Sequence, residues 1–202
     1  MAKPSWLIVS PTTGSGNGTV SNSANEHTGR VARTGTVTVT GVGVASPSTY
    51  KVTQSPKGEF VSFDNGVEMS APTTAGTVTV AGKSNSSKLT FSWAGESFEV
   101  DIPAKYLAGG VDTDNGVAIE GDPGASAQYA FSIALEFPKN DTIEEVTRVL
   151  VVTAAGGQSK QISIVQAAGD ARLSVSPTEI TIPQDGSAVS VTVTSNTSWT
   201  VS

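Results

Sequence analysis

The chain has 202 residues, of which 37% are hydrophobic, 6% aromatic and 15% charged, with a net charge of −6 and no cysteine. The lack of cysteine excludes a disulfide scaffold, and the negative charge argues against a nucleic-acid surface, which needs clustered Lys and Arg. Abundant Gly, Ser, Thr and Val favour many short strands joined by turns, in one or two domains.

Residues 1–55 contain few large apolar side chains. Residues 6–9 (WLIV) predict a short strand, a Gly-rich loop follows, Val20 marks a weak strand, and residues 36–54 predict a hairpin. The apolar run at residues 6–9 is too short for the hydrophobic part of a signal peptide, and no run approaches the about 18 apolar residues of a membrane span. We expect no membrane partner, and we expect that this segment cannot fold alone.

Residues 56–172 predict a complete domain. Strands are indicated at residues 60–63, 77–80, 89–93 and 98–102, and the regular alternation over residues 129–137 is the clearest strand pattern in the chain. A hairpin with a Gly156-Gly157 turn follows at residues 148–166, and residues 141–150 indicate a short helical turn. About seven short strands in this length are typical of an immunoglobulin-like β-sandwich.

Residues 173–202 predict three strands, because apolar residues alternate with polar ones at 173–175, 180–182 and 189–193. This segment resembles the start of the middle domain: SNTSWTVS at residues 195–202 matches SNSSKLTFS at residues 84–92. It therefore corresponds to the first half of a repeated unit.

Residues 33–54 match the hairpin at 148–166 in outline, each beginning with Arg and ending with Gln. Asn25 and Asn140 lie eight residues before Arg33 and Arg148. A repeat on this scale marks one domain used more than once. The chain therefore has the order second half, whole domain, first half.

Joined tail to head, the two terminal segments resemble the BACON domain, an immunoglobulin-like module of Bacteroidetes proteins and of the phages that infect them. The residues that carry the resemblance are Trp199, Trp6-Leu7, Gly14-Ser15-Gly16, Asn25, Arg33-Thr34-Gly35 and Val52-Thr53-Gln54. The middle domain is similar more loosely, through Asn140, Arg148 and Gln166.

The overall fold prediction is all-β: one complete immunoglobulin-like sandwich at 56–172, and one assembled from residues 1–55 and 173–202. Two half-sandwiches leave unpaired strand edges, so we expect them to associate. Closure could occur in cis, which effective concentration favours, or in trans between subunits. The residues expected to close the split sandwich are Trp6, Leu7, Val189, Val191, Val193 and Trp199.

Few residues suggest chemistry. His27 is the only histidine and is expected to be a solvated loop residue, and no nucleophile motif is present, so we expect no enzyme and no cofactor. Asp112 and Asp114 are weak candidates for a Ca²⁺ loop, but Asp114-Asn115-Gly116 is also what a tight turn requires.

Aromatic residues offer a second candidate site. Trp93 and Tyr106 could stack on a sugar, whereas Trp6 and Trp199 are better explained as core residues of the split sandwich. Carbohydrate binding is what the family's name implies.

The resemblance and the associating halves imply a structural virion protein of a phage, decorating the capsid or attached to the head and assembled in the host cytoplasm. Its partners would be the major capsid protein or other virion proteins and further copies of itself, with no nucleic acid. The alternative is a carbohydrate-binding module that mediates adhesion to glycans or mucus, and a weaker one is a fragment of a secreted glycan-utilisation protein.

Overall fold

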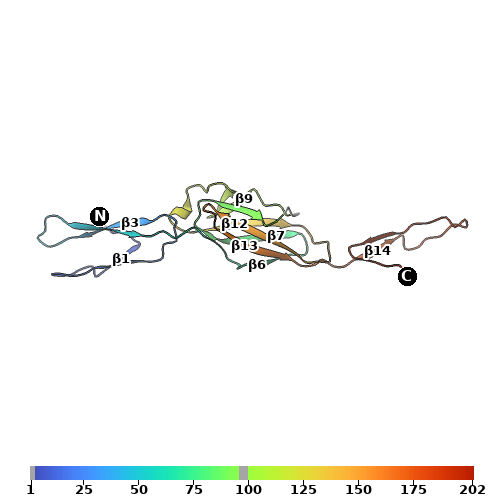
Figure 1. Ribbon diagram of the computed structural model, residues 1–202, viewed down its shortest axis with the longest axis horizontal. Helices are drawn as coiled ribbons and strands as arrows, with labels where there is room; N and C mark the ends of the chain where they lie inside the picture. The colour runs from blue at the N-terminus through green and yellow to red at the C-terminus, as the bar shows by residue number, and fades with distance from the viewer. Residues whose placement is uncertain (1–2, 96–99) are drawn as a thin grey trace.

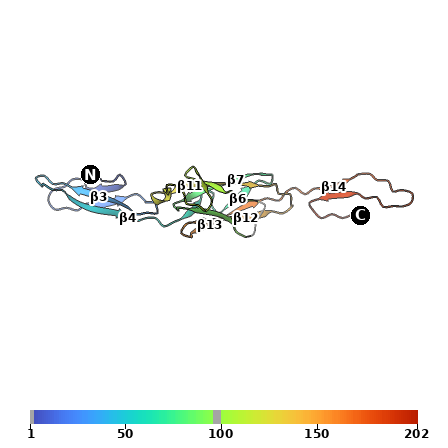
Figure 2. The ribbon, with the colours of Figure 1, turned by 90° about the horizontal axis from the view of Figure 1, so that it is seen from above.

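The computed structural model describes residues 3–95 and 100–202 and shows an elongated, almost entirely β molecule (Figure 1). An N-terminal segment, a middle domain and a C-terminal hairpin follow one another along its long axis, and the perpendicular view keeps the same order (Figure 2). The two terminal segments therefore lie at opposite ends of the middle domain. Within the described residues, no helix is long and apolar enough to cross a membrane.

The middle domain is a sandwich of two sheets. One sheet has the order β10-β9-β11-β7-β5 and the other β6-β13-β12-β8. A short 3₁₀ helix at Pro123–Ala125 precedes β11. The strands are β5 (Val61–Phe63), β6 (Glu68–Ala71), β7 (Gly76–Ser84), β8 (Leu89–Trp93), β9 (Lys105–Ala108), β10 (Val111–Asp114), β11 (Tyr129–Phe137), β12 (Val146–Ala154) and β13 (Ser159–Gln166).

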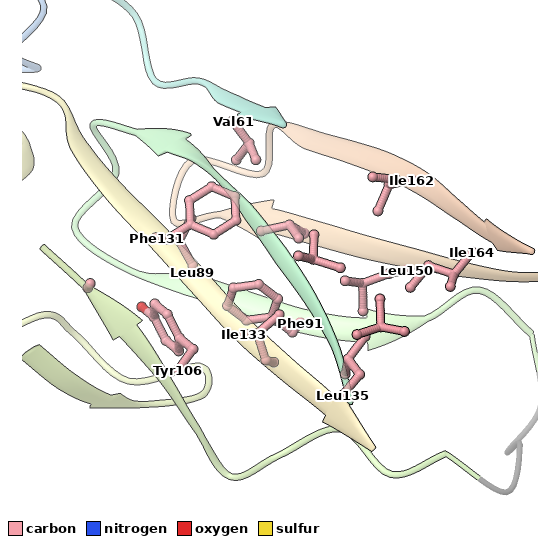
Figure 3. Close-up of a cluster of buried hydrophobic side chains, with 14 of the residues drawn as sticks. Val61, Leu89, Phe91, Tyr106, Phe131, Ile133, Leu135, Leu150, Ile162 and Ile164 are labelled. Atoms are coloured by element: carbon pink, nitrogen blue, oxygen red, sulfur yellow. The ribbon is translucent and has the colours of Figure 1, made fainter. Parts of the chain in front are cut away.

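The core lies between these two sheets (Figure 3). β11 buries every second side chain from Tyr129 to Phe137, because successive residues of a strand point to opposite faces. Phe91 of β8 packs against Phe131 and Tyr106 of the facing sheet, with ring centroids 5.8 and 4.8 Å apart. The alternation predicted from the sequence is thus the pattern that builds the core.

The terminal segments form small, separate sheets. In the N-terminal segment β1 (Leu7–Ser10) pairs with β2 (Ser21–Ala24), and β3 (Arg33–Val39) pairs with β4 (Ser48–Gln54). In the C-terminal hairpin β14 (Leu173–Ser176) pairs with β15 (Thr192–Ser195). The all-β class is confirmed. The split sandwich stays a prediction, because in the described residues no strand of the N-terminal segment pairs with a strand of the C-terminal hairpin.

Three local predictions were wrong. The helical turn at residues 141–150 is absent, and Val146 and Leu150 lie on β12; their four-residue spacing puts them on one face of a strand as well as of a helix. Residues 180–182 and 189–191 are not in strands, because no neighbouring strand bonds to them. Of the strand expected at 98–102, Phe98 lies outside the described residues, and residues 100–102 are not in a strand.

Candidate assembly interface

The weak metal candidates lie at a turn. Asp112 and Asp114 are exposed on β10, and the Nζ of Lys105 lies 3.4 Å from Asp114 Oδ1. The side chain of Asn115 bonds the backbone of Phe91 through both its oxygen and its nitrogen, at 2.8 and 3.1 Å, and Gly116 has a φ of +75°. The motif therefore has the turn geometry. In the described part of the chain, no three His, Cys, Asp or Glu side chains gather as a metal site.

The aromatic candidates do not form a stacking platform. Tyr106 is only 3% exposed and packs in the core, so its ring presents no face to a sugar. Trp93 is half-buried, and its indole N–H donates to the carbonyl of Val100 at 2.7 Å. The expectation of a sugar-stacking site is corrected for Tyr106, because its ring fills the space beside Phe91.

The residues expected to close the split sandwich fall into two groups at opposite ends. Leu7 is buried within the N-terminal segment, and Trp6 is half-buried beneath the guanidinium of Arg33, 4.7 Å from its ring centroid. At the other end Val193 is partly buried on β15, while Val189, Val191 and Trp199 are exposed. The structure does not bring the two groups together in one chain.

The C-terminal hairpin repeats the hydrogen bonds that Ser84 and Asn85 make in the middle domain. In the middle domain, the Oδ1 of Asn85 accepts the backbone N–H of Phe60 at 3.1 Å. In the hairpin, the Oδ1 of Asn196 accepts the N–H of Arg172 at 2.8 Å. β14 also pairs with β15 in the register of β5 with β7, since Leu173↔Ser195 corresponds to Val61↔Ser84.

The same two asparagines join each unit to the one before it. Their Nδ2 groups donate to carbonyls of the preceding unit and of the linker. The neighbouring serine hydroxyls donate to the carbonyl just before the first strand of their own unit. The bonds are Asn85 to Thr28 and Gly58 (3.1 and 3.2 Å), Asn196 to Asp141 and Asp170 (3.0 and 2.9 Å), Ser84 to Phe60 (2.7 Å) and Ser195 to Arg172 (3.0 Å). The two junctions of the chain are therefore built alike.

His27 is buried, not solvated as predicted, and its ring contacts the backbone of its own segment. Its Nε2 contacts the carbonyl of Val31 at 2.8 Å, and the Nδ2 of Asn140 donates to the carbonyl of Glu144 at 2.8 Å, four residues on in both cases. The counterpart of Asn140 is thus His27. Matching Asn25 to Asn140 by counting back from Arg33 and Arg148 was wrong by two residues.

The backbone register confirms this shift. Arg33 lies opposite Gln54, whereas it is Val146 that lies opposite Gln166. Both arginines still reach the glutamine side chain, because each stands on the same face of its strand: Arg33 Nε to Gln54 Oε1 is 2.9 Å, and Arg148 Nη1 to Gln166 Oε1 is 3.2 Å. The repeat therefore keeps the contact between arginine and glutamine, although the arginine stands two residues further along its strand in the middle domain.

Ion pairs reinforce each junction. At the first, the guanidinium of Arg30 forms a bidentate pair with Asp122 at 2.6 and 3.1 Å, and this pair raises the pKa of Arg30. At the second, Asp141 Oδ1 lies 2.9 Å from both Lys139 Nζ and Arg172 Nη2. Hydrogen bonds from Lys139 and then Arg172 lower the pKa of Asp141.

Close backbone contacts add to these pairs. A Cβ on Gly29 would overlap the backbone of Ser126, and one on Gly169 would overlap the carbonyl oxygen of Asn140. Glycine at both points lets the linkers lie against the sandwich. These contacts hold the terminal segments at opposite ends of the middle domain.

Each end of the molecule presents apolar side chains to solvent. Val201 is 84% exposed and Trp199 51% exposed at the C-terminal end. Others at the two ends are Val20, Val39, Leu173, Val175, Ile180, Ile182, Val189 and Val191. These side chains form the candidate interface, since large exposed apolar patches occur at interaction sites. Sequence reasoning found the apolar alternation but did not assign the Asn85 and Asn196 contacts, although the shared Ser-Asn-Ser/Thr motif was the available signal.

Comparison with known proteins gives a limited result. No protein-family model matches the chain, and no curated protein matches it. Among solved structures it is similar to the Bacteroides ovatus GH5 xyloglucanase in complex with a XXXG heptasaccharide, with 12% identity over 55% of this chain and 19% of that one and a TM-score of 0.35. It is also similar to an endo-fucoidan hydrolase of glycoside hydrolase family 107, with 12% identity over 83% of this chain and 22% of that one and a TM-score of 0.32. The chain thus spans about a fifth of the length of either structure.

Proposed function

We propose that this chain is a structural protein of a phage particle, a capsid-decorating or head-attached auxiliary subunit that acts by binding other virion proteins and copies of itself. The observation that carries the proposal is the set of exposed apolar side chains in the two terminal segments, which lie on either side of the middle domain. Burying such side chains against other subunits would be favourable, because it removes apolar surface from water. The resemblance of the joined ends to the BACON domain supplies the phage context.

The proposal includes a finer description of the fold. The middle domain is taken as an immunoglobulin-like sandwich, and the terminal segments as two halves of a BACON-like one. No catalytic activity, cofactor or nucleic-acid partner is assigned, and assembly takes place in the host cytoplasm. Glycan binding is not proposed, because Tyr106 is buried and no other observation favours a sugar site.

The test is to find the protein in its source culture. Particles are purified through a density gradient, and each fraction is analysed by mass spectrometry and by immunogold labelling with an antibody against the middle domain. We expect the chain to sediment with intact particles in a fixed ratio to the major capsid protein, and the gold to label the particle surface. Recovery only in the soluble fractions would overturn the virion assignment.

A further inference from the structure

The strands of the N-terminal segment lack neighbours that their counterparts have. β11 lies between β7 and β9, β12 between β13 and β8, and β13 between β12 and β6. Their counterparts are β2, β3 and β4, and in the described residues β2 pairs only with β1, while β3 and β4 pair only with each other. Each of these strands therefore presents one open edge to solvent.

The missing neighbours are present at the other end of the chain. β15 and the residues before it correspond to β7, residues 180–182 to β6, and residues 199–202 to β8. The apolar positions agree: Ile180 and Ile182 match Met69 and Ala71, while Trp199 matches Leu89. The same chain therefore has open edges on β2, β3 and β4 and, at its other end, the segments that correspond to the missing neighbours.

We propose that residues 173–202 of one copy complete the sandwich begun by residues 4–54 of a second copy, by adding strands to the open edges of β2, β3 and β4. This deepens the proposed self-association by naming its surfaces and register. Cis closure is disfavoured, because the junction contacts of Asn85 and Asn196 hold the two segments at opposite ends of the chain.

The register follows from the middle domain. There Gly76 lies opposite Phe137, and Thr77 opposite Glu136. Ser187 corresponds to Gly76, because each lies eight residues before the matching serine, Ser195 or Ser84. Ala24 corresponds to Phe137, because each lies three residues before the matching junction residue, His27 or Asn140. Ser187 of one copy therefore lies opposite Ala24 of the next, and Ala188 opposite Ser23.

Gln54 supplies an independent point of contact. Gln166 Nε2 donates to two carbonyls, those of Pro138 at 2.7 Å and Pro72 at 2.8 Å. Gln54 Nε2 donates to the carbonyl of Asn25, the counterpart of Pro138, at 2.8 Å. Pro183 lies twelve residues before Ser195, as Pro72 lies twelve before Ser84. The carbonyl of Pro183 from the first copy therefore fits the remaining donor of Gln54 in the second copy.

The charges of the two ends also match. Residues 1–55 carry four basic residues, Lys3, Arg30, Arg33 and Lys51, and one acidic residue, Glu26. Residues 173–202 carry two acidic residues, Glu179 and Asp185, and no basic one. Opposite net charges favour association of the two ends and disfavour pairing of like ends.

The assembly is an open chain of subunits. Its contact is heterologous, since two different surfaces meet, and such contacts give filaments unless the rotation closes a ring. The ends lie at opposite poles of an elongated molecule, and both junctions use the same asparagine contacts. Repeating this junction places each sandwich in line with the last.

The test uses disulfide trapping, which suits a chain without native cysteine. In Ser23→Cys/Ala188→Cys, the proposed register places the two Cα atoms about 5 Å apart, within disulfide range. Both positions are exposed in the single chain, so the variant keeps the fold. Mild oxidation of the purified protein is expected to give a ladder of covalent oligomers on a non-reducing gel.

The matched control is Ser23→Cys/Ser190→Cys, which moves the second thiol by two residues, about 7 Å along the strand and out of range. It is expected to remain monomeric, and adding Val201→Asp to the first variant should abolish its ladder. Equal ladders from both variants, an intramolecular disulfide, a closed dimer, or no cross-link would each overturn the proposal. This test uses purified protein and no phage particle. If the ladder forms but the protein does not sediment with particles, only the virion assignment is refuted, and the self-association stands.

Discussion

Gln166 and Gln54 occupy corresponding points in the middle domain and in the N-terminal segment, yet their surroundings differ. Gln166 is 1% exposed and its amide bonds two backbone carbonyls, while Gln54 is partly exposed and bonds one. The same local sequence pattern thus gives a closed site where strands of both sheets surround it, and an open one where, in the described residues, β3 and β4 pair only with each other. The difference indicates that burial in this protein depends on strand neighbours, since the hairpins themselves are alike.

The largest effect should come from the complete core. Phe131→Ala removes a buried ring between β8 and β11 and should lower the free energy of unfolding of the middle domain by about 3–5 kcal/mol. Urea unfolding followed by circular dichroism measures it. The matched change at an open end, Val201→Ala, should leave the unfolding midpoint of the dilute chain unchanged while reducing oligomers at high concentration. A lower midpoint for Val201→Ala in dilute solution would contradict the comparison.

The glutamine pair gives the next largest contrast. Gln166→Ala removes the buried amide that bonds two backbone carbonyls and Arg148 Nη1, and should cost about 1–3 kcal/mol of unfolding free energy. Gln54→Ala should cost much less in the isolated chain, because water reaches the same groups. Light scattering across concentrations should show instead that Gln54→Ala weakens self-association. Equal losses of stability in both variants would mean that the N-terminal segment is already closed.

A smaller effect is expected at the junction. Asn196→Ala removes the acceptor for the N–H of Arg172 and donors to two carbonyls, at a cost of about 1 kcal/mol because the site is partly exposed. Hydrogen exchange at the amide of Arg172 should accelerate. The control is Ser198→Ala at an exposed neighbouring position, which should leave this exchange rate unchanged. Asn85→Ala, at the buried counterpart, should be more damaging. The reverse order would contradict the equivalence of the two junctions.

Much of the fold could be predicted from periodicity, because strands such as Tyr129–Phe137 have both neighbours inside the domain. Residues 180–182 have the same alternation but form no strand, since alternation describes which face a strand buries and cannot supply its partner. The burial of His27 was missed for a related reason. The ring of His27 contacts the carbonyl of Val31 in the folded loop, and single-sequence patterns do not record such contacts.

The smallest expected effect tests the charge at the second junction. The pKa of Asp141 is lowered below its ordinary value of 3.8 by the hydrogen bonds from Lys139 and Arg172, so the ionised carboxylate stabilises the docked hairpin. A lowered folded-state pKa means that this stabilisation is fully present above pH 3.8 and is lost as the pH falls through the lower value. The protection factors of the amides at residues 170–172, which correct for the intrinsic exchange rate at each pH, should therefore fall at acid pH, and Asp141→Asn should remove this dependence. Because the pair is exposed, added salt should weaken the effect as well, whereas the bonds of Asn196 should persist. If Asp141→Asn keeps the acid response, the hairpin is held by groups other than this carboxylate.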